Sequence, residues 1–246
     1  MNGYVTFVND NKKYIDLTDI LVESILEFSK YDIEIFSINY KYNHSSNRVH
    51  NRIINLDIVN YDTICYSKLY STFNSMFDYG VQLDADMIIT KEADNLFEDC
   101  IKIKNTPLGS LHPHDPNNQQ NIMEFLNVKE KTQPYVHATY LFSNSCKLFL
   151  EECYKISQEL LKLKIRPSNL DETIYNVMLW KYGSVDYVDC YDPMYDVFLA
   201  HDAKEFGGYR DMKKINYYIC HGQKNYNDAK VIFNKIKENI NYEDSK

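Results

Sequence analysis

The stretch Val81-Gln82-Leu83-Asp84-Ala85-Asp86-Met87-Ile88-Ile89 places two acidic residues between two apolar runs. The apolar runs are typical of short buried strands, and the acidic residues between them predict a turn. Carboxylates at positions i and i+2 at the end of a strand point to the same side. Two such charges repel each other unless a cation neutralises them, and oxygen ligands suit Mg²⁺ or Mn²⁺. We therefore expect Asp84 and Asp86 to bind a divalent metal.

On both sides of this stretch, apolar runs alternate with segments that carry apolar residues at helical spacing. This alternation predicts an α/β fold with a mostly parallel central sheet flanked by helices. One domain over residues 1–240 and a polar tail at 241–246 account for the chain. Asp16 or Thr18 is expected to cap the first helix, and Gly80 is expected to end the helix before the acidic stretch. Strands are expected at residues 4–8, 33–38, 53–58, 81–83, 87–89, 108–111, 139–142 and 184–188, and helices at 17–28, 67–78, 145–163, 169–180 and 228–239.

Composition excludes several classes of function. The chain has 246 residues and a net charge of −8, and an acidic chain without a long basic run is a poor partner for nucleic acid. No apolar stretch reaches the ~18–20 residues of a membrane span, so no integral membrane segment is expected. The six cysteines form no C-x-x-C pair, and the first residues lack the features of a signal peptide. Free thiols and a cytoplasmic location are the expectation.

Two segments together resemble the GT-A type glycosyltransferases, in particular the glycogenin and lipopolysaccharide-galactosyltransferase family (glycosyltransferase family 8). They are Tyr66-Ser67-Lys68-Leu69-Tyr70, on an expected helix, and Gln82-Leu83-Asp84-Ala85-Asp86, the Asp-x-Asp segment. The resemblance implies a GT-A fold and metal-dependent transfer of a sugar from a nucleotide-sugar, most simply a UDP-sugar, to a hydroxyl acceptor. It implies that the segment Asp84-Ala85-Asp86 engages metal and ribose and that Lys68 contacts the diphosphate or donor sugar. The acceptor can be a glycan, a lipid-linked molecule or a protein.

The segment Ile219-Cys220-His221-Gly222-Gln223-Lys224 resembles the C-terminal motif of the same family. The resemblance implies that His221 is the third metal ligand. An imidazole ligand favours Mn²⁺ somewhat over Mg²⁺. Gly222 and Lys224 then belong to the diphosphate site, with Lys224 acting as a point charge on phosphate.

Two further segments resemble the family's substrate-binding parts. In Asn169-Leu170-Asp171-Glu172-Thr173-Ile174-Tyr175-Asn176, the pair Asp171 and Glu172 stands where the family places residues beside the transferring sugar. Ser168 and Asp171 also fit a capping box at a helix start. The loop after the first strand, with Val8, Asn9 and Tyr14, occupies the position that holds the nucleobase in such folds, and the resemblance implies that role here. Tyr14 either stacks on the base or packs against the protein. Residues 137–144 resemble the strand that lines the donor-sugar pocket. His112 and His114 lie in a loop that either is solvated or contacts the acceptor or the metal.

The stereochemistry and two other functions stay open at this point. No strong general base is evident, which fits the retention of configuration that the resemblance implies, although Asp171 or Glu172 could serve as the base of an inverting enzyme. A haloacid-dehalogenase-like phosphatase would use Asp84 as nucleophile and Asp86 beside it. A non-catalytic nucleotide-binding domain would keep the site without the chemistry.

Overall fold

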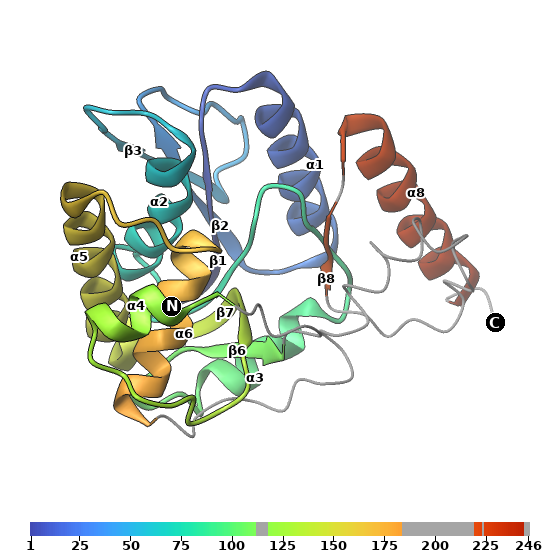
Figure 1. The fold of residues 1–246 in the computed structure, drawn as a ribbon. Coiled ribbons are helices and arrows are strands. Elements are labelled where there is room, and N and C mark those ends of the chain that lie inside the picture. Colours follow the sequence, from blue (N-terminus) through green and yellow to red (C-terminus); the bar gives the residue numbers. More distant parts are fainter. Residues whose placement is uncertain (112–117, 184–218, 223, 244–246) are drawn as a thin grey trace.

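A computed structural model of the chain describes residues 1–111, 118–183, 219–222 and 224–243. In these ranges the chain is an α/β protein with a mixed six-stranded sheet flanked by helices (Figure 1). The strands are β1 (Asn2–Val8), β2 (Asp32–Ile38), β3 (Val49–Ile54), β4 (Tyr79–Gln82), β5 (Ile88–Ile89), β6 (Leu108–Leu111), β7 (Val136–Ser143) and β8 (Ile219–Cys220). The helices are α1 (Lys12–Phe28), α2 (Tyr61–Phe73), α3 (Leu96–Cys100), α4 (Gln120–Phe125), α5 (Lys147–Leu163), α6 (Leu170–Tyr182) and α8 (Tyr226–Glu243).

The main sheet has the strand order β3-β2-β1-β4-β7-β6. The strands β3, β2, β1 and β4 are parallel, β7 runs antiparallel to β4, and β6 runs antiparallel to β7. From β1 the chain adds β2 and β3 on one side, then returns through α2 to place β4 on the other side of β1. The order therefore reverses between β1 and β4. Ligands of open α/β sheets bind at such a point, outside the carboxyl ends of the strands.

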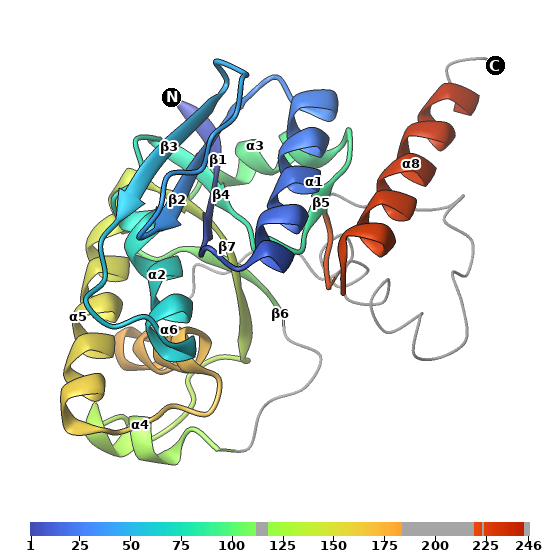
Figure 2. The same cartoon turned by 90° about the horizontal axis from the view of Figure 1, so that it is seen from above.

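Helices cover both faces of this sheet. Figure 2 shows α1 on one side of the sheet, with α8 outside α1, and α2, α5 and α6 on the other side. The main core fills the space between the sheet and the helices packed on it with fully buried side chains such as Tyr4, Phe36 and Trp180. Helix α1 begins earlier than expected, because Asn11 caps it by accepting a hydrogen bond from the Lys13 amide. The prediction of Asp16 or Thr18 as the cap was wrong.

Three predictions near the acidic stretch were wrong. Helix α2 begins at Tyr61 because Asn60 and Thr63 form a capping box, and it ends at Phe73 rather than at Gly80. Gly80 lies inside β4, where a Cβ atom would come within 2.2 Å of the Phe142 ring. Its role is close packing between neighbouring strands, not the end of a helix. The third strand spans Val49–Ile54 instead of 53–58.

A smaller second core joins the C-terminal part of the chain to α1. Strands β5 and β8 pair antiparallel, and α8 packs beside α1 with Phe28 and Phe233 in edge-to-face contact at 5.6 Å between ring centroids. Lys230 pairs with Glu23, and Lys237 with Glu27, along the same interface. Helix α8 continues to Glu243, so residues 241–243, which were expected in a polar tail, are helical.

The cysteines in the described ranges are free thiols, as expected: Cys65, Cys100, Cys146, Cys153 and Cys220. Burial raises the pKa of Cys146 and Cys220 to about 12, so these thiols stay protonated at neutral pH. In the part of the chain that the structure describes, no helix combines the length and apolar character needed to cross a membrane. The expected strand at 184–188 and the loop with His112 and His114 lie outside the described residues.

Candidate metal and substrate site

The acidic pair lies in a tight turn between β4 and β5, at the carboxyl end of β4. The Met87 amide donates a hydrogen bond to the Asp84 carbonyl at 3.1 Å, and the Asp84 amide donates to the Met87 sulfur at 3.3 Å. This turn, rather than the alternation of side chains along a strand, brings Asp84 and Asp86 to one side. The Leu83 amide donates to the Val5 carbonyl at 2.8 Å, which ties the turn to β1 at the point where the strand order reverses.

His221 reaches the same turn through the pairing of β5 with β8. Cys220 lies opposite Ile88, so His221, one residue later, lies beside the end of the acidic turn. Its Nε2 is 3.5 Å from Asp86 Oδ1. One ligand atom each from Asp84, Asp86 and His221 lies within 4.8 Å of the others. Two carboxylates and one imidazole at this separation are a donor set that fits Mn²⁺ or Mg²⁺.

The charges of Asp86 and His221 stabilise each other. Burial lowers the pKa of His221, but the Asp86 carboxylate, with help from Asp84, outweighs burial and leaves the pKa raised. Burial likewise raises the pKa of Asp86, but His221 outweighs it and leaves that pKa lowered. The pair therefore favours an imidazolium beside a carboxylate, and a divalent cation bound here would replace the proton on His221.

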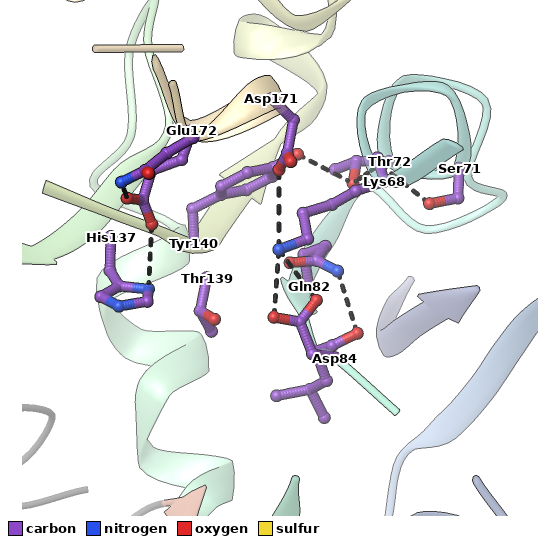
Figure 3. A network of polar contacts seen from close by, with 12 residues as sticks. Lys68, Ser71, Thr72, Gln82, Asp84, His137, Thr139, Tyr140, Asp171 and Glu172 are labelled. Atoms are coloured by element: carbon purple, nitrogen blue, oxygen red, sulfur yellow. Dashed lines mark hydrogen bonds and ion pairs between the residues drawn. The ribbon is translucent and has the colours of Figure 1, made fainter. Parts of the chain in front are cut away.

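Lys68 lies on α2 with its side chain only 10% exposed, and it faces two carboxylates. Its ammonium is 2.8 Å and 3.0 Å from the two oxygens of Asp84 and 3.6 Å from Asp171 Oδ2 (Figure 3). Burial lowers the pKa of Lys68, but the two carboxylates outweigh burial and raise it overall. Lys68 is thus a fixed positive charge that joins the acidic turn to the start of α6.

Asp171 and Glu172 are neighbours on the first turn of α6, but they face different partners (Figure 3). Asp171 turns toward Lys68, and its Oδ2 atom is buried without a hydrogen-bond partner. Burial, partly offset by Lys68, raises the pKa of Asp171 to about 7. The residue before this pair, Leu170, has a φ of 43°, which is rare for a bulky side chain and indicates local strain.

Glu172 faces the first residues of β7. Its Oε2 lies 3.3 Å from His137 Nδ1, and its Oε1 accepts a hydrogen bond from the Asn169 side chain at 3.3 Å. Ser168 bonds to Thr173 rather than forming the predicted capping box with Asp171. Sequence reasoning placed His137 only within a strand near the donor pocket. The signal that it missed is direction: β7 is reversed, so its first residues lie at the same edge of the sheet as the carboxyl ends of the parallel strands.

Asn176 fixes this edge of the site. Its side chain accepts a hydrogen bond from the Val136 amide at 2.8 Å and donates to the Val136 carbonyl at 2.7 Å. It also donates to the Glu172 carbonyl one helical turn earlier, at 2.8 Å. One buried amide therefore holds the start of β7 against the first turn of α6.

The other predicted site residues lie around the same edge. Val8 ends β1 and is buried, and Asn9 follows it and accepts a hydrogen bond from the Asn11 amide. Tyr14 lies on the first turn of α1, 37% exposed, with the Lys13 ammonium 5.4 Å from its ring centroid. Ala85 is buried between the two aspartates.

Gly222 and Lys224 follow His221 in the chain. Gly222 has a φ of 80°, a backbone conformation that favours glycine, and Lys224 is exposed between β8 and α8. Gln223 lies outside the described residues.

No protein-family model matches this chain, and no curated protein matches it. The interpretation of the site therefore depends on its geometry and on the chemistry of its residues.

Proposed function

We propose that this chain is a metal-dependent glycosyltransferase of the GT-A type that transfers a sugar from a UDP-sugar to a hydroxyl acceptor. The observation that carries this proposal is the convergence of Asp84, Asp86 and His221 at the edge of the sheet where the strand order reverses. Asp86 and His221 lie 135 positions apart in the chain. The segments that resemble the glycogenin family follow one another in the order that the family has: basic helix, Asp-x-Asp, Asp-Glu helix and His-Gly-x-Lys. This order supports the same function.

In this proposal Asp84, Asp86 and His221 hold Mn²⁺ or Mg²⁺. When bound, such an ion neutralises diphosphate oxygens and stabilises the departing nucleotide. Lys68 adds a second positive charge at the same place and favours an anionic ligand. Val8, Asn9 and Tyr14 form the nucleobase side, and Gly222 and Lys224 form the phosphate side, as the resemblance implies.

The two acidic residues of α6 take different roles. A buried carboxyl group with a pKa near 7 can give or take a proton at neutral pH, and Asp171 is such a group. Both carboxylate oxygens of Glu172 are engaged by Asn169 and His137. We therefore assign contact with the reacting sugar or acceptor to Asp171. Retention of configuration is the outcome that the family resemblance implies.

The test is turnover of a panel of UDP-, GDP- and CDP-sugars with Mn²⁺, measured as release of the nucleoside diphosphate. Wild-type protein should release UDP from at least one UDP-sugar, and Asp86→Ala should not. p-Nitrophenyl phosphate serves as the parallel substrate. Hydrolysis of the phosphate ester that needs Asp84, with no nucleotide released, would replace this proposal with a phosphatase.

A further inference from the structure

Glu172 does not face the proposed metal directly. It lies on the first turn of α6, with one oxygen held by Asn169 and the other 3.3 Å from His137 Nδ1 (Figure 3). The side chains of His137 and Glu172 are 15% and 11% exposed, so solvent competes little for their contact. The contact between Glu172 and His137 is therefore largely buried.

The imidazole of His137 is held at its backbone as well. The preceding residue, Val136, has both its amide and its carbonyl bonded to the Asn176 side chain. Asn176 also bonds to the Glu172 carbonyl. The backbones that carry His137 and Glu172 are therefore fixed relative to each other, and the side-chain contact fixes the orientation of the ring.

The ring of His137 also contacts the ring of His221. The two rings meet nearly edge-to-face, with centroids 5.9 Å apart and an interplanar angle of 81°. Aromatic rings favour this arrangement at this separation. The contacts thus form a continuous series, from Glu172 to His137 to the imidazole that is proposed to bind metal.

We infer that Glu172 and His137 are positioning residues that orient the His221 imidazole for a divalent cation. The inference rests on the metal site proposed above. Metal-ligating histidines depend on partners outside the ligand set that fix the ring, and loss of such a partner typically lowers metal affinity 10–100-fold. Here the contact that fixes the ring is the packed ring of His137, so the lower end of that range, about tenfold, is expected.

The test is a titration with Mn²⁺ alone, followed by the electron paramagnetic resonance signal of the free ion. His137→Gln keeps a hydrogen-bonding partner for Glu172 but has no ring, and it should bind Mn²⁺ about tenfold more weakly. Glu172→Ala should weaken binding in the same direction. Glu172→Gln still offers an oxygen to His137 and should stay within about twofold of wild type.

The matched control is His50→Gln. His50, on β3, pairs through Nε2 with Asp32 at 2.8 Å, so this change also removes a histidine–carboxylate pair, but from another part of the sheet. It should leave Mn²⁺ affinity unchanged. Thermal unfolding of each metal-free variant shows whether it is folded. If Glu172→Ala is unfolded, the comparison of Glu172→Gln with His137→Gln still tests the inference.

The outcomes separate this inference from the proposed function. If wild-type protein binds no Mn²⁺, the metal site itself is wrong. If wild type binds Mn²⁺ and His137→Gln binds it equally well, only the positioning role is overturned. The positioning role would also be overturned if Glu172→Gln lost as much Mn²⁺ affinity as Glu172→Ala. The negative charge of Glu172, and not its orientation of the His137 ring, would then be the cause.

Discussion

Replacement of Lys68 by methionine tests the charge balance of the site. The ammonium group contacts both oxygens of Asp84, at 2.8 Å and 3.0 Å, and lies 3.6 Å from Asp171, with the lysine side chain 10% exposed. Removal of one partner from a buried ion pair costs about 3–5 kcal/mol, because the remaining charge stays buried. We expect Lys68→Met to lower the free energy of unfolding by roughly 3 kcal/mol at pH 8.

The loss should be smaller at pH 5.5, and the sign follows from the two pKa shifts. The pKa of Lys68 is raised, so its contribution is fully present below the unfolded-state value, that is, at both pH values. The pKa of Asp171 is about 7, so below that pH Asp171 takes up a proton and no longer needs a cation beside it. Part of the loss caused by Lys68→Met therefore disappears at pH 5.5.

Mn²⁺ provides the decisive comparison. A cation bound by Asp84 replaces the charge that Lys68 supplied, so saturating Mn²⁺ should shrink the difference between Lys68→Met and wild type. Urea unfolding at both pH values, with and without Mn²⁺, measures this. Lys147→Met is the control, since Lys147 donates to the backbone carbonyls of Ser75 and Phe77, and its effect should not depend on Mn²⁺. A loss below about 1 kcal/mol at pH 8 would place Lys68 in the range of a surface ion pair, and a loss unaffected by Mn²⁺ would show that Asp84 binds no cation.

Three further predictions concern residues that build the site. The carboxyl group of Asp171, whose pKa is raised to about 7, stabilises the fold at pH 4 and loses that contribution as the pH rises to 8. Asp171→Asn should therefore gain roughly 3–4 kcal/mol of unfolding free energy relative to wild type between pH 4 and pH 8. If urea unfolding gave the same pH dependence for both proteins, this prediction would be contradicted. Asn176→Ala leaves the Val136 amide and carbonyl without their partner and should cost roughly 2–4 kcal/mol in the same assay; a loss within error of zero would contradict the clamp. Gly80→Ala should lower the free energy of unfolding by about 1–3 kcal/mol, because the new methyl group meets the Phe142 ring, and Phe142→Leu in the same chain should recover part of the loss; an undiminished stability would exclude the clash.

Local patterns in the sequence predicted most strands and helices. Apolar runs located β1 and β2, and helical spacing located α5, because these elements bury one continuous set of side chains. The errors arose where short-range bonds or tertiary packing decide. The capping box at Asn60 starts α2 at Tyr61, earlier than expected. Gly80 contacts Phe142 across two strands that lie far apart in the sequence.

The candidate site was partly predictable for the same reasons. Asp84 and Asp86 were visible as a pair, but their convergence depends on a turn closed by Met87. His137 was not assigned, because its place beside Glu172 follows from the reversed direction of β7 and from the bonds of Asn176. Neither the direction of β7 nor the hydrogen bonds of Asn176 can be inferred from the local sequence pattern.

The metal-dependent nucleotide site is best examined by calorimetry of UDP binding with and without Mn²⁺, on wild type and Asp86→Ala. We expect wild type to bind UDP only with Mn²⁺. UDP at ~100-fold excess over Kd should stabilise the fold by roughly 2.7 kcal/mol, and Asp86→Ala should lose both effects. GDP and CDP should bind more weakly. The site would be excluded if wild-type protein bound no nucleotide with Mn²⁺ present, or if UDP bound equally well without the metal and to Asp86→Ala.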